Sequence, residues 1–333
     1  MRGLQFVISP EHRLRVVFLP IAAMSISVCA SLAQAQGFPA KPVRFIVPYA
    51  PGGNTDMMAR TLGQKIAENV GRSVVVENRG GAATLIGAEL VAKSPADGYT
   101  ILLATSTTLS INPHLYQKLP YDPVRDFTPI VLVGRTPMVM VVHPSLPAKT
   151  VKEFIAIARS RPGQLPYGTS GTGSPSFMGA AMFRSAARLD MIEVPYKGSG
   201  PADIDLLSGQ IVMMFQNTAL NYIKAGRLRA LAHTGEKRMP VLPEVPTMTE
   251  AGLKNCVFYS WQGIVGPANM PPEVVARLNT EFNKALAASD VRSRMTYDGA
   301  ELFGGTPEQF TTYISSEIAR LGKVIRDTGV RPE

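Results

Sequence analysis

The stretch Val43-Arg44-Phe45-Ile46-Val47-Pro48-Tyr49-Ala50-Pro51-Gly52-Gly53-Asn54-Thr55-Asp56 (VRFIVPYAPGGNTD) decides the fold. Its first five residues are mostly apolar and β-branched or aromatic, which predicts a strand ending at Pro48. The glycine turn at Pro51-Gly52-Gly53 follows, and an amphipathic helix is expected from about Asp56 to Asn69. A strand that leads through a glycine turn into a helix indicates an α/β fold.

The same alternation continues along the rest of the chain. Further strands are expected at 73–77, 99–104, 165–168, 193–196, 211–215 and 228–233, with extended segments at 136–143 and 257–266. Helices are expected near 86–93, 150–160, 176–187, 202–207, 221–226, 272–288 and 307–327. The last two helices follow one another without a strand and are expected to pack back on the first lobe. The pattern predicts mostly parallel sheets flanked by helices.

Two lobes are expected, because roughly 300 residues are too many for one small core. The extended segments near 136–143 and 257–265 are predicted to carry the chain between them. The expected boundaries place 36–138 with 258–333 in the first lobe and 139–257 in the second. Hinge motion at the two crossings would open and close the space between the lobes.

Residues 1–35 are typical of a signal peptide. Arg2, Arg13 and Arg15 make a basic start, an apolar run follows, and Ala33-Gln34-Ala35 fits a cleavage site. The chain after cleavage is expected to begin near Gln36. An uncleaved anchor and a lipid-modified Cys29 are the alternatives, and Val28 before Cys29 disfavours the second. Export to the periplasm is therefore predicted.

The charge pattern argues against nucleic-acid binding. The net charge is +9, and residues 1–35 hold three Arg and one Glu, so about +7 remains after cleavage. These charges are scattered, without a basic block or interleaved aromatic residues. A basic surface would attract anionic solutes.

No catalytic, metal or cofactor motif is evident. There is no Gly-x-Ser-x-Gly elbow and no Walker loop. The histidines at 114, 143 and 233 are far apart, so no metal site is predicted. Cys256 alone remains after cleavage and is expected to be buried, because it cannot form an internal disulfide. A monomer that is not an enzyme and needs no cofactor is expected.

Three junctions between a strand and a helix are candidates for ligand binding. In open α/β sheets, ligands bind outside the carboxyl ends of the strands, where glycines allow close approach and helix N-termini favour anions. Ordinary turns and caps are the alternative for each junction alone, whereas three together favour an anion site. The candidate residues are Pro51, Gly52, Gly53, Asn54, Thr55 and Asp56; Thr105, Ser106 and Thr107; and Thr169, Ser170, Gly171, Thr172, Gly173 and Ser174.

Three weaker candidates follow these junctions. Asp205 would accept a hydrogen bond from a ligand or only interact with a helix dipole. Asn217 follows an apolar strand, and Lys197 would pair with an acid or remain a solvated turn residue.

Motifs throughout 38–330 resemble the TctC/Bug family, the periplasmic solute receptors of tripartite tricarboxylate transporters. They include Pro51–Asp56 with Arg60, Val76–Arg79, Leu119–Pro123, Tyr167–Gly171 and Val194–Gly198, in family order. The chain departs from the usual pattern at Ala83-Thr84-Leu85-Ile86-Gly87, where the family usually has a Gly-Gly-Asn-Ile-Gly-like turn. It departs again at Phe215-Gln216-Asn217, where an Asp is usual.

The resemblance implies a clamshell of the type II periplasmic binding protein kind and a small carboxylate ligand held without a cofactor. It implies that the loop after the first strand and the Gly168–Ser174 loop seat the carboxylate, with Asp205 near its distal end. Implied partners are the permease subunits of a tripartite transporter or a membrane sensor kinase. A hydrolase or lyase with Asp56 or Asp205 as base is the remaining alternative, disfavoured by the missing catalytic groups.

Overall fold

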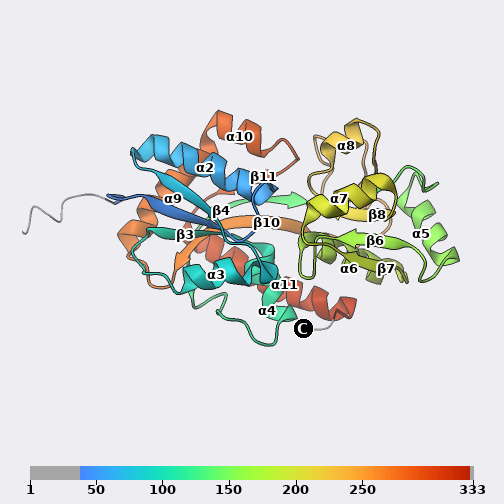
Figure 1. The fold of residues 1–333 in the computed structure, drawn as a ribbon, viewed down its shortest axis with the longest axis horizontal. Coiled ribbons are helices and arrows are strands. Elements are labelled where there is room, and N and C mark those ends of the chain that lie inside the picture. Colours follow the sequence, from blue (N-terminus) through green and yellow to red (C-terminus); the bar gives the residue numbers. More distant parts are fainter. Residues whose placement is uncertain (1–37, 331–333) are drawn as a thin grey trace, which may run out of the picture. The chain divides into compact units, whose positions relative to one another are not determined.

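The computed structural model describes residues 38–330, so the predicted signal peptide at 1–35 lies outside the described residues. Lys41–Glu333 form one compact unit. Within it are two sheets, each with helices on both faces (Figure 1).

The larger sheet, called sheet A, has six strands. Their order is β11 (Glu301–Gly304), β4 (Phe127–Pro137), β10 (Tyr259–Pro267), β3 (Thr100–Thr105), β1 (Val43–Val47) and β2 (Val74–Asn78). One face is covered by α2 (Asn54–Val70), α9 (Pro272–Ala287) and α10 (Ser289–Met295). The other is covered by α3 (Leu85–Ala92) and α11 (Pro307–Thr328).

The smaller sheet, called sheet B, has five strands. Their order is β7 (Ile192–Pro195), β6 (Pro166–Thr169), β8 (Met213–Gln216), β5 (Val139–Val142) and β9 (Arg229–His233). Helices α5 (Val151–Ser160) and α6 (Pro175–Ala187) pack on one face, and α7 (Ser199–Ser208) and α8 (Leu220–Lys224) on the other. Short helical turns complete the fold: η2 (Ala82–Thr84), η3 (Thr107–Ile111) and α4 (Asn112–Leu115).

Both sheets are mixed, so the expectation of mostly parallel sheets is wrong in this detail. Only β1–β2, β1–β3, β6–β7 and β6–β8 are parallel pairs. The strands that carry the chain between the sheets, β4, β5 and β10, run antiparallel to their neighbours. Helical crossovers produce parallel pairs, whereas a strand that continues directly from one sheet into the other need not follow that direction.

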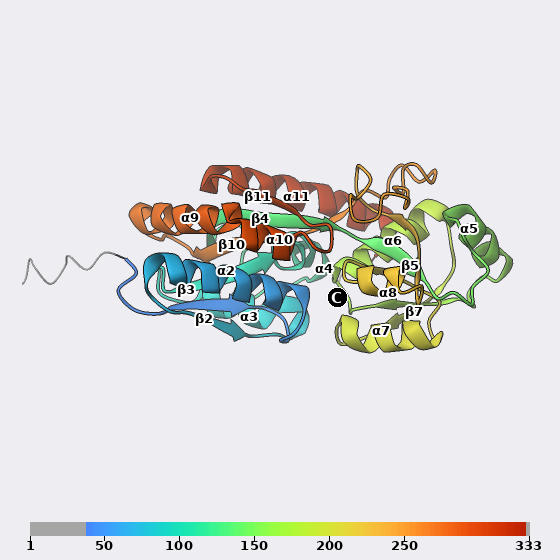
Figure 2. The ribbon, with the colours of Figure 1, turned by 90° about the horizontal axis from the view of Figure 1, so that it is seen from above.

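The chain passes between the sheets twice. β4 continues through Met138 into β5, and the segment 234–258 leads back to β10. Thr234 joins the two passages, because it exchanges hydrogen bonds of 2.9 Å with the Met138 backbone and its carbonyl accepts from the Phe258 N–H at 2.9 Å. The Thr234 hydroxyl also donates to the Phe258 carbonyl. Both passages are thus held together at Thr234. Figure 2 shows β4 leading into β5 along the first of them.

The C-terminal part of the chain departs from expectation in two ways. The short strand β11 lies between α10 and α11, where no strand was expected, because four half-exposed residues carry too little apolar periodicity. The helix α11 does not pack only on sheet A. Leu321 and Ile325, near its end, join the core beside α6 on sheet B.

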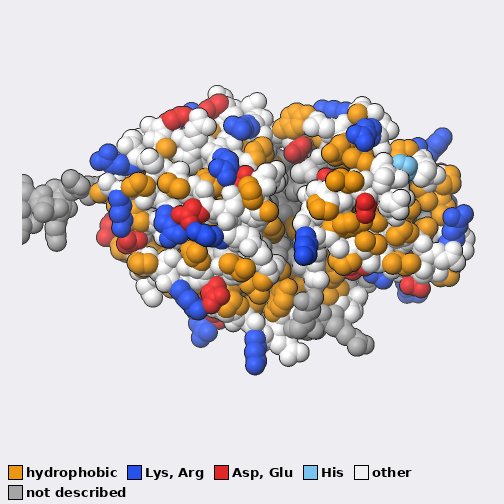
Figure 3. Space-filling model, in the orientation of Figure 1, with side chains coloured by type: hydrophobic (Ala, Val, Ile, Leu, Met, Phe, Trp, Pro, Cys, Tyr) orange, Lys and Arg blue, Asp and Glu red, His pale blue; other side chains and the backbone are white. Residues whose placement is uncertain are grey.

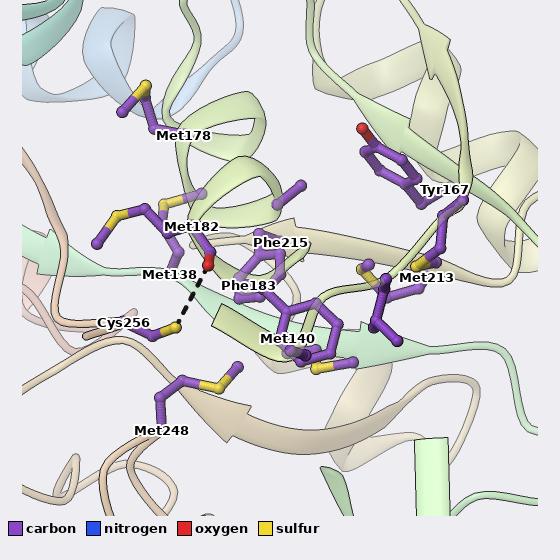
Figure 4. Packing of buried hydrophobic residues seen from close by; sticks show 14 of the residues in the cluster. Met138, Met140, Tyr167, Met178, Met182, Phe183, Met213, Phe215, Met248 and Cys256 are labelled. Atoms are coloured by element: carbon purple, nitrogen blue, oxygen red, sulfur yellow. Dashed lines mark hydrogen bonds between the residues drawn. The ribbon is translucent and has the colours of Figure 1, made fainter. Parts of the chain in front are cut away.

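That core is rich in methionine (Figure 4). Met138, Met140, Met182 and Met213 surround Phe183 and Phe215 there. The Cys256 thiol contacts the Met182 carbonyl at 3.6 Å and is 1% exposed, so the expectation of a buried cysteine is confirmed. Flexible thioether side chains fill irregular space well, which suits a core that receives side chains from several elements.

Candidate functional site

The structure brings the three predicted junctions together. The loops after β1 and β3 leave the same edge of sheet A, since these strands are parallel neighbours. Tyr49 and Thr105 join them through their hydroxyls at 3.4 Å. The Thr107 hydroxyl donates to the Gly173 carbonyl at 3.0 Å, which links this edge to the loop after β6. Figure 3 shows a groove between the surface over α2 and α3 and the surface over α7.

Asp56 organises the first junction and is 5% exposed. Its carboxylate accepts hydrogen bonds from the Gly52 N–H at 3.0 Å, Arg60 Nε at 3.0 Å and Asn78 Nδ2 at 2.9 Å. Burial alone would raise the Asp56 pKa, but the hydrogen bonds from Arg60, Gly52 and Asn78 outweigh it and lower the pKa. Asp56 therefore acts as a positioning residue that shapes the glycine turn.

The N-terminus of α2 differs from that of α6. Gly53 is the N-cap of α2, and within residues 38–330 no side chain caps it. Ser174 is the N-cap of α6, and its hydroxyl accepts from the Phe177 N–H. An N-terminus without a capping side chain leaves backbone N–H groups for another acceptor. The first junction is thus the better anion seat of the two.

The second junction is a short π-helix, η3, and not an open loop. Thr105 and Thr108 share a hydrogen bond of 3.1 Å, and the Thr108 hydroxyl donates to that of Thr84 at 3.1 Å. Ser106 is buried, and its hydroxyl has no hydrogen-bond partner in the part of the chain that the structure describes. This junction is therefore lined by hydroxyl groups.

Thr84 lies in a strained turn that sequence reasoning treated only as a departure from the family pattern. Ala82, Ala83 and Thr84 have φ values of 44°, 48° and 78°. The left-handed conformation costs about 1–2 kcal/mol for each residue with a side chain. Asn112 holds the turn by donating to the Ala83 carbonyl at 2.8 Å. The three residues were missed as site residues, although the Ala83–Gly87 departure drew attention to them.

The third junction ends in a network of serine hydroxyls. Ser176 accepts from the Ser170 N–H at 2.8 Å and lies 2.8 Å and 2.9 Å from the hydroxyls of Ser170 and Ser174. Thr169 donates to Glu193 at 2.9 Å. Gly171 and Gly173 have φ values of 107° and 73°, which L residues rarely adopt. The loop is thus pre-shaped by its own contacts.

The weaker candidates lie beside this third junction. The Asp205 carboxylate accepts from the Tyr196 hydroxyl at 2.6 Å. Lys197 is exposed, and Asn217 is half-buried. Sequence reasoning missed Asp203, whose carboxylate accepts from Gln216 Nε2 at 2.6 Å. Asp203 and Asp205 lie two residues apart on α7 (Ser199–Ser208), so they point to different sides of the helix and have different partners.

A separate surface pocket of about 460 Å³ lies over residues 113–126. Its carboxylates are occupied by their own loop, because Asp126 accepts from the Asp122 N–H and Asp122 accepts from the Val124 and Arg125 N–H groups. The pocket is therefore lined by a loop whose carboxylates stabilise the loop itself. It is not part of the site formed by the three junctions.

Residues 38–330 contain no group of three His, Cys, Asp or Glu side chains that could hold a metal ion. The histidines have structural partners: His114 contacts the Ile318 carbonyl at 2.8 Å and His143 contacts Ser145 at 2.7 Å. Burial lowers the pKa of His233. None of the helices in this range has the length and apolar character needed to cross a bilayer.

Comparison with known proteins gives a consistent result. The model of the tripartite tricarboxylate transporter family receptor, TctC, matches residues 58–330. Protein BugT of Bordetella pertussis is 37% identical over 323 residues, which cover 96% of this chain and 98% of BugT.

Two solved structures are similar in both sequence and fold. R. palustris Rpa4515 with adipate is 36% identical with a TM-score of 0.85, covering 89% of this chain and 100% of that one. MatC from Rhodopseudomonas palustris with bound malate is 32% identical with a TM-score of 0.81, covering 86% and 100%.

Proposed function

Since the chain belongs to the tripartite tricarboxylate transporter family of receptors, we propose that it captures a small carboxylate in the periplasm for uptake by the permease subunits of such a transporter. Members of this family are periplasmic substrate-binding receptors and not enzymes, and the chain is such a receptor. The carboxylate ligand class, the permease partnership and export through residues 1–35 are the proposed parts.

The observation that carries the proposal is the contact between Thr107 and the Gly173 carbonyl. It joins loops from the two sheets at the place where both sets of strands end. A ligand held there would meet the α2 N-terminus, glycine backbone and several hydroxyls. Helix N-termini contribute about 0.3–1 kcal/mol each toward an anion, and hydrogen bonds to a charged group about 1.5–3 kcal/mol.

The adipate and malate named for the two similar structures are both small carboxylates, which supports the same class here. We propose that backbone N–H groups and hydroxyls of the three junctions seat the ligand carboxylate, while Asp56 positions the glycine turn. Lys197, Asp205 and Asn217 are proposed to line the sheet B side.

The two sheets and the two passages between them support a division into lobes, 36–138 with 258–333 and 139–257. We propose that the lobes close on the ligand by hinge motion at Met138 and at 234–258. A ligand favours the closed form only as far as it binds that form more tightly.

A thermal-shift screen of the purified protein against mono-, di- and tricarboxylates tests the ligand class. A ligand at 100 times its dissociation constant adds about 2.7 kcal/mol of stability. Thr169→Ala combined with Ser170→Ala is expected to reduce the shift, while Ser315→Ala on the exposed side of α11 serves as the matched control. No shift with any acid, in protein shown by denaturing mass spectrometry to carry no ligand, contradicts the proposal.

Cell fractionation with N-terminal sequencing tests the localisation. The expected result is a periplasmic protein whose first residue is near Gln36. Recovery of the intact N-terminus in the cytoplasmic fraction contradicts it.

A further inference from the structure

Asp203 and Gln216 form a polar pair at the sheet B end of the groove. Gln216 is the last residue of β8, and Met214 lies two residues earlier on the same face, which packs on α7. β8 runs parallel to β6, so its end lies on the same edge as the Gly168–Ser174 loop. Asp203 comes from α7, whose buried residues Ala202 and Leu206 pack on this face.

The only hydrogen-bond donor of this pair is the Gln216 amide nitrogen, and its contacts are all internal to the protein. Gln216 Nε2 donates to Asp203 Oδ1 at 2.6 Å and contacts Met214 Sδ at 3.4 Å. Gln216 is 2% exposed, and its Oε1 has no partner among residues 38–330. A carboxylate only accepts hydrogen bonds, and Oε1 is also an acceptor. The opposite amide orientation would place two acceptors against each other.

The pair also carries negative charge that no cation neutralises. No ion pair to Asp203 is formed within the described residues. The charged groups on neighbouring segments are Asp205, which accepts from Tyr196, and the exposed Lys197. Burial raises the Asp203 pKa to about 6, and only the Gln216 hydrogen bond opposes this. A buried acceptor without a partner is unfavourable, so a ligand that supplies a donor here is favoured.

We propose that Asp203 and Gln216 determine specificity, by favouring carboxylates that carry an ammonium or hydroxyl group at the far end over those that carry a second carboxylate. The proposal rests on the proposed binding of a carboxylate at the three junctions. A donor at the far end meets the carboxylate oxygen of Asp203 that Gln216 leaves unused, whereas a second carboxylate meets like charge and finds no donor.

Gln216 occupies the position where the sequence departs from the Phe-Asp-Asn pattern of the resembling family. This pair therefore has one carboxylate, that of Asp203 on α7, and the Gln216 amide orients that carboxylate. This arrangement keeps the Asp203 carboxyl in one position through a hydrogen bond that consumes the amide's donors. The amide is thus a positioning group, and Asp203 is the group offered to the ligand.

Matched ligand pairs test the proposal by calorimetry on the purified protein. Succinate is compared with γ-aminobutyrate, and adipate with ε-aminocaproate, because each pair differs only in the far-end group. The amino acid of at least one pair is expected to bind about tenfold or more tightly than its dicarboxylate, and Asp203→Asn is expected to remove most of that preference. Asn keeps an oxygen for the Gln216 amide, so the variant is expected to fold.

Asp190→Asn, an exposed carboxylate between α6 and β7, is the matched control and is expected to leave the ratio unchanged. Equal or tighter binding of the dicarboxylates, with a ratio that Asp203→Asn does not change, overturns the specificity proposal while leaving carboxylate binding intact. Binding of no acid from either pair or from the wider screen overturns carboxylate binding and this inference with it.

Discussion

On the sheet A side of the groove the Asp56 carboxylate is surrounded by three donors, whereas on the sheet B side the Asp203 carboxylate has one. The pKa of the first is lowered and that of the second is raised to about 6. A carboxylate thus stabilises a loop through internal hydrogen bonds on the sheet A side, and it remains an incompletely satisfied acceptor on the sheet B side. The comparison indicates that the sheet A carboxylate holds its own loop in shape, whereas the sheet B carboxylate is the group that we propose discriminates between ligands.

Removing the Asp56 carboxylate is expected to have the largest effect on the free energy of unfolding. Asp56→Ala leaves the Gly52 N–H without its acceptor, removes the partner of Arg60, and leaves the Asn78 amide with only the Tyr49 carbonyl. The free energy of unfolding is therefore expected to fall by about 3 kcal/mol. Urea unfolding measures it. Glu89→Ala, which removes the exposed ion pair with Lys93, is the control and is expected to cost about 0.5 kcal/mol or less. Equal losses for both variants would contradict the role of Asp56.

The incompletely satisfied carboxylate is expected to respond in the opposite direction. The folded pKa of Asp203 is about 6 and its ordinary value is 3.8, so the folded state binds the proton more tightly. The contribution of Asp203 to stability is therefore largest below about pH 4 and is lost as the pH rises through about 6. Asp203→Asn does not titrate and is expected to gain about 2 kcal/mol relative to the wild type between pH 4 and pH 8.

Urea unfolding of both proteins across this range checks the prediction for Asp203. Asp190→Asn, which changes an exposed carboxylate, is expected to show no such trend. A constant difference between Asp203→Asn and the wild type at every pH would show that burial does not perturb Asp203.

The contact that joins the two walls is expected to have a smaller effect. Thr107→Val removes the hydroxyl that donates to the Gly173 carbonyl, and the free energy of unfolding is expected to fall by about 1 kcal/mol. Ligand dissociation, followed by stopped flow, is expected to be several times faster because the loops lose their link. Thr312→Val, whose hydroxyl bonds only within α11, is the control. Unchanged dissociation would separate this contact from ligand binding.

The smallest effect is expected at Glu77, beside Asn78 on the sheet A side. Its hydrogen bond with Arg44, and a further one with Arg79, lowers the Glu77 pKa to about 2 from 4.5, against the effect of burial. This stabilisation is present above about pH 4.5 and is lost as the pH falls through about 2. Glu77→Gln is expected to cost about 0.5 kcal/mol at pH 7, because its arginine partners are half-exposed, and little at pH 2, measured by thermal unfolding. A cost that does not depend on pH would point to packing instead.

Local features of the chain were predictable. The strand Val43–Val47 was predicted with its observed bounds. The helix expected at 150–160 was also observed as α5, and Thr150 at its start is the N-cap that accepts from the Glu153 N–H at 3.2 Å. The Glu153 carboxylate in turn accepts from the Lys149 N–H at 2.7 Å. These features depend on neighbours in the chain, and short-range rules describe them well.

Other features depend on which strands become neighbours. The antiparallel pairing of β10 with β3 and β4 and the late strand β11 left no clear local signal. The contact of Asp203 with Gln216 likewise depends on how α7 packs on β8, which no pattern within either element specifies.

The sequence by itself determined the succession of strands, glycine turns and helices, the family resemblance and the three polar junctions, because these depend on local periodicity and turn chemistry. Only the tertiary structure decided which polar groups meet. Thr107 and Gly173 are 66 residues apart, and Asp203 and Gln216 are 13 apart on different elements. Strand order and the two passages between the sheets bring such pairs together, and no local pattern records that arrangement.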